Sequence, residues 1–298
     1  MREIVVISGK GGAGKSSVCA ALAHMAAGTA VIGDLDVDAP DLHILLDPRD
    51  GDATPFTGGR TAVIDATRCA GCGRCLELCR FEAIRPGSTG LPQIDAGACE
   101  GCGVCVRLCP EGAIEFPARQ SGEWCVGRTR FGDFIHARLF PGEENSGRLI
   151  TLLKREARAL AKATGKELIL HDGSPGIGCP VISSLSGASL VVAVVEPTPS
   201  GLHDFERVAS LCRHFRVPVS VIINKATLSP KTCDALRAAA RAAGHDIAGE
   251  LPFTAAIPQA MIRKKAFTET SPDLRRLMLD IWKRILLALE TTSRGRSR

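Results

Sequence analysis

Hydrophobic and polar positions divide most of the chain into short apolar runs and longer stretches of mixed composition. The apolar runs are typical of buried strands and lie at 3–8, 30–33, 168–170, 190–195 and 219–223. The longer stretches have helical character and lie at 16–27, 147–163, 201–214 and 229–243. Strands that alternate with helices form a parallel sheet with helices on both faces. The pattern therefore predicts a doubly wound α/β domain.

This alternation stops between residues 61 and 117, where cysteine and glycine dominate and helical periodicity disappears. The segment contains an internal repeat, because the pattern of Cys69–Cys79 recurs 30 residues later at Cys99–Cys109. A changed composition with its own repeat indicates an inserted module. We expect the α/β domain to occupy residues 1–60 and 118–298, with the inserted domain at 61–117 between them.

Composition narrows the class of protein. Of the 298 residues, 45% are hydrophobic and 23% charged, and no apolar run reaches the roughly 18 residues that suggest a membrane span. These values exclude a disordered chain, a collagen and an integral membrane protein. The N-terminus enters a strand-like run at once, without the features of a signal peptide, so we expect a soluble cytoplasmic protein. The net charge of +5 is too small to indicate a nucleic-acid partner.

The glycine-rich segment Gly9–Ser17, which reads GKGGAGKSS, follows a predicted strand and precedes a predicted helix. In this context backbone amides converge on phosphate groups, Lys15 reaches the β- and γ-phosphates, and the hydroxyl of Ser16 binds Mg²⁺. A glycine-rich turn that binds nothing is the alternative, and the flanking elements disfavour it. The segment predicts a site for ATP or ADP with Mg²⁺, lined by Gly11, Gly12, Ala13, Gly14, Lys15, Ser16 and Ser17.

Lys10 departs from an ordinary phosphate-binding loop. With it, the segment resembles the deviant Walker A loop of the MinD/Mrp/nitrogenase-iron-protein superfamily, the SIMIBI class. In those proteins a lysine at this place crosses a dimer to the partner's nucleotide. The resemblance implies that Lys10 is catalytic and offsets γ-phosphate charge in trans, in a homodimer or a heterodimer with a related ATPase. A solvated surface lysine is the alternative.

Three further segments follow the order of that family. The run from Asp34 to Pro40 resembles switch I, which implies that Asp36 orients the attacking water and that Asp34 lies near Mg²⁺. The run from His171 to Pro180 resembles switch II, which implies that Asp172 binds Mg²⁺ through a water molecule and that the loop moves when the γ-phosphate leaves. Asn224 follows a strand at the place where the family reads the adenine amide edge; a polar pair in a turn is the alternative.

Eight of the 13 cysteines form two runs of Cys-x2-Cys-x2-Cys-x3-Cys. This is the spacing of a bacterial ferredoxin with two 4Fe-4S clusters, in which the fourth cysteine of each run binds the other cluster. We therefore assign Cys69, Cys72, Cys75 and Cys109 to one cluster, and Cys99, Cys102, Cys105 and Cys79 to the second. Zinc is the competing metal, although zinc sites normally use pairs of cysteines rather than triplets. Disulfides are disfavoured in a chain without a secretion signal.

Several features outside these motifs lead to further expectations. Arg80 stands where the ferredoxin pattern has proline, and a guanidinium beside a cluster favours its reduced form. The remaining cysteines are expected to be mostly buried small residues, with Cys179 singled out by its place in the switch II segment. A last helix begins near Pro272 and packs its apolar face on the sheet, with membrane contact as the alternative. The segment Glu143–Gly147 precedes a helix and has no assigned role.

The whole chain thus resembles the MinD/Mrp-type P-loop ATPases with an inserted small α+β ferredoxin-like domain. The leading hypothesis is a dimeric ATPase with two 4Fe-4S clusters, ATP or ADP and Mg²⁺, which serves an unknown partner in redox delivery or in iron–sulfur or metallocofactor assembly. The first alternative is a MinD-like scaffold or positioning protein whose clusters sense redox state or serve docking. The second is a ferredoxin that holds nucleotide as a static structural ligand.

Overall fold

The structure is a computed structural model that describes residues 1–295. It consists of two compact units. The sheet unit comprises Met1–Thr54, Trp124–Arg138 and the chain from Ser146 onwards. The cysteine unit comprises Pro55–Glu123 and Leu139–Asn145.

A parallel sheet forms the centre of the sheet unit. Its strand order is β14-β13-β12-β1-β11-β2, and every neighbouring pair in this series is parallel. The strands are β1 (Arg2–Ile7), β2 (Ala30–Asp34), β11 (Leu168–Asp172), β12 (Leu190–Val195), β13 (Val219–Ile223) and β14 (Asp246–Glu250). The sheet continues beyond β2 through β10 (Gly132–Leu139), β9 (Ala118–Thr129) and β3 (Arg49–Asp50), and β4 (Thr54–Arg60) pairs with β9.

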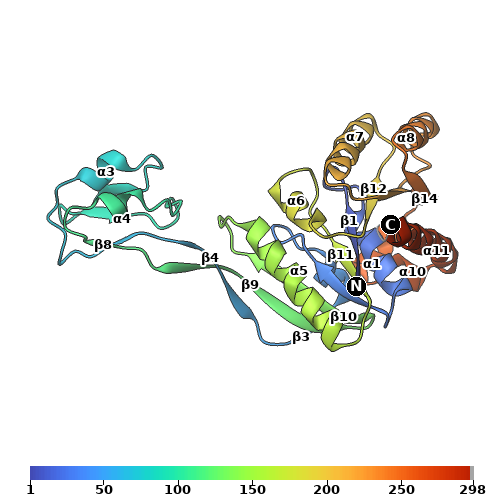
Figure 1. Cartoon of the computed structure of the whole chain (residues 1–298), viewed down its shortest axis with the longest axis horizontal. Helices are drawn as coiled ribbons and strands as arrows, with labels where there is room; N and C mark the ends of the chain where they lie inside the picture. Colours follow the sequence, from blue (N-terminus) through green and yellow to red (C-terminus); the bar gives the residue numbers. More distant parts are fainter. Residues whose placement is uncertain (296–298) are drawn as a thin grey trace. The chain divides into compact units, whose positions relative to one another are not determined.

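Helices cover both faces of this sheet (Figure 1). Side chains alternate between the faces along a strand, so Ile4 and Val6 of β1 belong to one hydrophobic core and Val5 and Ile7 to the other. The first core lies under α1 (Lys15–Met25), α2 (Leu42–Leu46), α9 (Ala256–Ile262), α10 (Phe267–Thr270) and α11 (Pro272–Gly295). The second lies under α6 (Cys179–Leu185), α7 (Pro199–His214) and α8 (Pro230–Ala242). The doubly wound architecture expected from the sequence is confirmed.

The last helix packs on the protein, as its apolar spacing indicates. Leu274, Met278, Ile281, Ile285 and Leu289 of α11 are all buried in the first core. Helix α11 contacts β12 and β14 of the sheet. Among residues 1–295, no helix combines the length and the apolar character that crossing a bilayer requires.

The cysteine unit is a small α+β fold with two similar halves. Its short helices α3 (Arg74–Leu78) and α4 (Val104–Leu108) contact each other (Figure 1). Two antiparallel pairs accompany them, β5 (Val63–Ile64) with β8 (Ile114–Glu115) and β6 (Ile84–Pro86) with β7 (Pro92–Ile94). The expected ferredoxin-like class of the insertion is confirmed.

The compact cysteine unit extends beyond the expected segment 61–117 because neighbouring strands join it. Strand β4 pairs with β9, and the segment after β10 returns to the same unit, where the amide of Phe140 donates to the carbonyl of Ser121 at 2.9 Å. Strand β9 has no regular alternation of polar and apolar residues, and β10 alternates only over residues 135–139, so the sequence pattern did not reveal them. The chain between them is only Arg130–Phe131, and so short a connection joins antiparallel strands.

Candidate functional site

The loop between β1 and α1 is shaped by two left-handed glycines. Gly12 has φ 81° and Gly14 has φ 91°, a conformation that favours glycine. A Cβ atom on Gly14 would lie 2.2 Å from Nδ2 of Asn224, so glycine is also required by space. Helix α1 begins at Lys15 without a side-chain cap, and its first-turn amides have no acceptor within the helix. The loop therefore presents a helix N-terminus suited to an anion such as phosphate.

Two residues that follow β13 hold this loop in place. Asn224 is 4% exposed, and its Nδ2 donates to the carbonyl of Ala13 at 2.8 Å while its Oδ1 accepts the amide of Lys225 at 3.0 Å. The ammonium group of Lys225 donates to the carbonyl of Gly12 at 2.9 Å. Two carbonyls of the loop are therefore held by side chains that follow β13. Asn224 thus braces the loop, and the role in base recognition that the resemblance implies for it stays a prediction.

Lys15 lies among the carboxylates of the switch segments. Its ammonium group is 2.8 Å from Oδ1 of Asp172, 3.3 Å from Oδ2 of Asp36 and 3.4 Å from the hydroxyl of Ser16. Burial disfavours the charge on Lys15, but the carboxylates of Asp172, Asp36 and Asp34 outweigh it and raise the pKa of Lys15. Lys15 is therefore a positively charged side chain that these carboxylates hold in place. It lies at the position that the sequence predicts for phosphate contact.

Asp34 is fully buried at the end of β2 and anchors the segment that follows. Its Oδ1 accepts the amide of Asp36 at 3.0 Å, and its Oδ2 accepts the amide of Leu42, the first residue of α2, at 3.1 Å. Burial raises the pKa of Asp34, and the negative charge of Asp172 raises it further. Burial also raises the pKa of Asp36, although Lys15 opposes the shift.

Asp172 provides the best fit for a metal ion. It is fully buried, and its Oδ2 finds no hydrogen-bond partner among residues 1–295. A buried carboxylate oxygen without a donor is costly, and Mg²⁺ typically binds through one or two carboxylates, water and substrate phosphates. Asp172, Asp34 and the hydroxyl of Ser16 are oxygen ligands of the kind that Mg²⁺ prefers.

The switch II segment after Asp172 is bonded to both neighbouring segments. The amide of Gly176 donates to the carbonyl of Ser8 at 2.8 Å, and the hydroxyl of Ser174 donates to the carbonyl of Leu35 at 3.0 Å. A Cβ atom on Gly173 would lie 2.9 Å from Cγ2 of Ile7. A displacement of this segment would therefore disturb its hydrogen bonds to the segments that contain Ser8 and Leu35.

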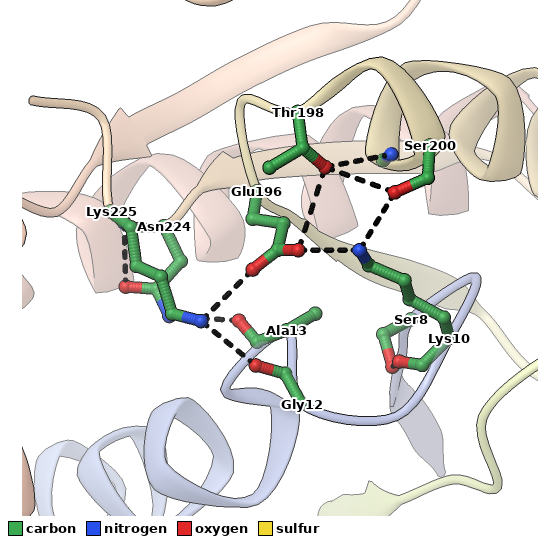
Figure 2. A network of polar contacts seen from close by, with 10 residues as sticks. Ser8, Lys10, Gly12, Ala13, Glu196, Thr198, Ser200, Asn224 and Lys225 are labelled. Atoms are coloured by element: carbon green, nitrogen blue, oxygen red, sulfur yellow. Dashed lines mark hydrogen bonds and ion pairs between the residues drawn. The ribbon is translucent and has the colours of Figure 1, made fainter. Parts of the chain in front are cut away.

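Lys10 binds within its own chain. Its ammonium group is 2.5 Å from Oε1 of Glu196 and 2.9 Å from the hydroxyl of Ser200 (Figure 2). The other oxygen of Glu196 lies 2.9 Å from the ammonium group of Lys225. Sequence reasoning did not identify Glu196, Ser200 or Lys225 as site residues. The signal was present, because Glu196 directly follows a strand whose carboxyl end meets the loop in a parallel sheet.

The eight cysteines of the two runs gather around two cavities. One is lined by Cys69, Cys72, Cys75 and Cys109. The other is lined by Cys79, Cys99, Cys102 and Cys105. In each run the third cysteine lies in the first turn of a short helix and the fourth lies just beyond its end. The helix therefore separates the fourth sulfur from the first three and delivers it to the other cavity.

Both cavities suit a cluster better than a single ion. Within the described part of the chain, no three His, Cys, Asp or Glu side chains are placed to hold one metal ion. A 4Fe-4S cluster uses four thiolates that cap different iron atoms and so need not converge on a point. The amide of Ala113 also donates to Sγ of Cys109 at 3.3 Å, a contact that tunes cluster potentials.

The cysteines outside the runs differ in burial. Cys19, Cys212 and Cys233 are buried, as expected of small core residues, and burial raises the pKa of the Cys212 thiol to about 12. Cys125 is half-buried and Cys179 is exposed at the start of α6.

The segment 139–145 belongs to the cysteine unit and leads directly into α5 (Ser146–Ala163). Glu143 forms an ion pair with Arg119, and Arg119 donates to the carbonyl of Ala96 at 2.7 Å. Ala96 lies three residues before Cys99 in the sequence. Within the cysteine unit, Glu143 of the segment to which the sequence assigned no role is thus linked through Arg119 to the loop before one cysteine run.

Comparisons with known proteins agree with both parts of this description. Residues 62–116 match the family of 4Fe-4S dicluster domains. The uncharacterized protein MJ0578 of Methanocaldococcus jannaschii is 36% identical over 225 residues, which are 75% of this chain and 78% of that protein.

The fold is similar to that of the cell division ATPase MinD of Pyrococcus furiosus, with a TM-score of 0.58 and 15% identity over 96% of this chain and 99% of that one. It is also similar to the septum site-determining protein MinD of Pyrococcus horikoshii OT3 in complex with Mg-ADP, with a TM-score of 0.57 and 15% identity over 95% of each chain. At this identity the similarity establishes the fold.

Proposed function

This chain belongs to the family of MJ0578, with a MinD-type P-loop fold and an inserted 4Fe-4S dicluster domain, and on that premise we propose a dimeric ATPase whose nucleotide state controls electron transfer through its clusters. The clusters deliver electrons to a partner protein, which is either a redox protein or a protein of iron–sulfur or metallocofactor assembly. The proposal has three parts, namely hydrolysis, cluster binding and the coupling between them.

In the hydrolytic part, the amides of residues 11–17 hold the phosphates and Lys15 moves from Asp172 and Asp36 to the β- and γ-phosphates. Mg²⁺, when bound, neutralises phosphate charge and orients the nucleotide. Ser16 and Asp172 hold it, with Asp34 nearby. Released from Lys15, Asp36 orients the attacking water. Support comes from the 2.8 Å contact of Lys15 with Asp172 and from the unpartnered Oδ2 of Asp172.

Lys10 completes the site of a second subunit. Its side chain is about one-third exposed, and its ammonium group contacts Glu196 and Ser200. In a dimer it stabilises negative charge that develops at the partner's γ-phosphate. Hydrolysis then requires dimerisation.

In the cluster part, each four-cysteine cavity holds one 4Fe-4S cluster, which supplies one-electron transfer when bound. Cys69, Cys72, Cys75 and Cys109 hold one, and Cys99, Cys102, Cys105 and Cys79 hold the other. The two cavities and the family match over residues 62–116 support this assignment.

Coupling between the nucleotide site and the clusters is supported by the path that the chain takes after Asp34. The amide of Leu42 binds Asp34, so α2 begins on a switch I carboxylate. After α2 the chain forms β3, which pairs with β9, and then β4, which belongs to the cysteine unit from Pro55 onwards. On the return, 139–145 leads into α5, where Lys154 donates to the carbonyl of Ser184 in α6 at 2.5 Å. Helix α6 directly follows switch II, so both connections begin or end at nucleotide-responsive segments.

The experiment that tests the proposal is a redox titration of anaerobically purified protein without nucleotide, with ADP and with a non-hydrolysable ATP analogue. A tenfold difference in nucleotide affinity between oxidised and reduced protein appears as roughly 59 mV for one electron. We expect a shift of that order in at least one cluster. Identical potentials in all three states would contradict energetic coupling and favour a MinD-like scaffold whose cysteine unit serves docking or redox sensing.

A further inference from the structure

The carboxylate of Glu196 is shared by two lysines. It lies at the end of β12 between the ammonium groups of Lys10 and Lys225, one on each oxygen, at 2.5 and 2.9 Å (Figure 2). Its side chain is 11% exposed. Burial alone would raise the pKa of Glu196, but the two lysines overcome that effect and lower it. Glu196 is therefore ionised at neutral pH and is the principal counter-charge of Lys10.

The same network fixes Lys10 from a second side. Ser200 in the first turn of α7 accepts a hydrogen bond from Lys10 at 2.9 Å, and Thr198 contacts the hydroxyl of Ser200 at 3.2 Å. Thr198 is itself the N-cap of α7, because its hydroxyl accepts the amide of Gly201. Lys10 is thus held by an acceptor on a capped helix as well as by a carboxylate on a strand end.

Lys225 has a partner that does not depend on Lys10. Besides Glu196, its ammonium group binds the carbonyl of Gly12 in the phosphate loop at 2.9 Å. If Lys10 leaves, Glu196 keeps Lys225 and remains a paired carboxylate. An unpaired buried carboxylate is strongly unfavourable, so Lys225 lowers the free energy needed to release Lys10.

We propose that Glu196 is a positioning residue that stores Lys10 in its own subunit and so sets the concentration at which the ATP-bound dimer forms. This rests on the proposed function, in which Lys10 acts on the nucleotide of a second copy of this chain. The dimer gains the contacts of two lysines with phosphate and loses two contacts with Glu196. Glu196 opposes dimerisation, Lys225 favours it by sharing the carboxylate, and Ser200 adds a smaller opposing contribution.

The test is sedimentation velocity with a non-hydrolysable ATP analogue and Mg²⁺. Glu196→Gln should lower the dimer dissociation constant about tenfold or more, because two charged contacts no longer hold the lysines. Ser200→Ala should lower it by a smaller factor. Lys225→Gln should raise it, because Lys10 is then the one charged partner left to Glu196 among the described residues, beside the hydroxyl of Thr198 at 3.5 Å. An unchanged or larger dissociation constant in Glu196→Gln would overturn the proposal.

Three controls separate this outcome from others. Nucleotide affinity measured at protein concentrations that keep each variant monomeric shows whether the loop is intact, and Ser200→Ala tests the same store without altering Glu196. In a Lys10→Ala background, Glu196→Gln should have no effect on dimerisation, since nothing remains to be stored. If Lys10→Ala dimerises like the wild type, the trans role of Lys10 fails. If Lys10→Ala dimerises less well than the wild type, and the single variant Glu196→Gln leaves the dissociation constant unchanged, only the storage role fails.

Discussion

The ammonium group of Lys15 lies 2.8 Å from Oδ1 of Asp172, and both side chains are buried. The lysine that the sequence assigns to phosphate contact thus rests on the carboxylate assigned to Mg²⁺. Asp36 accepts the same ammonium group at 3.3 Å. Phosphate would compete for Lys15 and release both carboxylates together, so nucleotide binding and the arrangement of both switch segments are linked through one side chain.

Lys15→Met should abolish ATP hydrolysis, with a loss of at least about a hundredfold, because a charge that stabilises the transferring phosphoryl group is removed. Phosphate release measures it, and Lys162→Met, at an exposed position of α5, is the matched control. The same variant distinguishes the functional hypotheses. Reduction of the clusters by dithionite should survive, whereas partner reduction should be lost. Partner reduction at the wild-type rate would indicate a ferredoxin with a static nucleotide.

Pairs of cysteine substitutions test which sulfurs share a cluster. Cys69→Ser with Cys109→Ser removes two thiols from one cavity, so about four of eight iron atoms per chain should remain. Cys69→Ser with Cys79→Ser removes one thiol from each cavity and should impair both clusters. Iron and sulfide analysis with electron paramagnetic resonance distinguishes the two outcomes. If each run binds its own cluster, the second pair would spare one cluster and the first would damage both.

Arg80→Ala should lower the potential of the cluster held beside Cys79 by tens of millivolts, because an exposed guanidinium favours the more negative, reduced cluster. Arg80→Lys keeps the charge and serves as the control. The potential of the second cluster gives an internal reference in the same titration. Equal potentials in wild type and Arg80→Ala would show that burial and hydrogen bonds to sulfur outweigh this charge.

Lys154 predicts a pH dependence of stability. It is buried in α5 beside Glu3, and burial lowers its pKa from 10.5 to about 8 despite that partner. Between these values the unfolded chain binds more protons than the folded chain, so the contribution of Lys154 to stability rises with pH.

The free energy of unfolding of the wild type, relative to Lys154→Met, should increase between pH 8 and 10.5 by roughly 3 kcal/mol at most. Denaturant titrations across this range measure the difference. A difference that is constant or decreases with pH would contradict the lowered pKa. Lys162→Met again serves as the control, because this lysine on the same helix is exposed.

The sequence by itself determined the features that depend on local pattern. Apolar runs and helical spacing identified β1, β2, β11, β12 and β13 and the helices α1, α5, α7 and α8, because the spacing of apolar residues follows from the side of the element that is buried. The phosphate loop and the two cysteine runs were readable because their spacing is short and each position has a chemical reason. Strands β9 and β10 were not, since they lack a continuous apolar run.

Only the tertiary structure decided which distant residues meet. Lys10, Glu196 and Lys225 come from three strand ends that are far apart in sequence, and a parallel sheet brings such ends to one edge. The pairing of Arg119 with Glu143 likewise required the chain to return to the cysteine unit after β10. A short motif indicates the chemistry of a loop. The residue that pairs with a charged side chain of that loop depends on strand order, which no local pattern specifies.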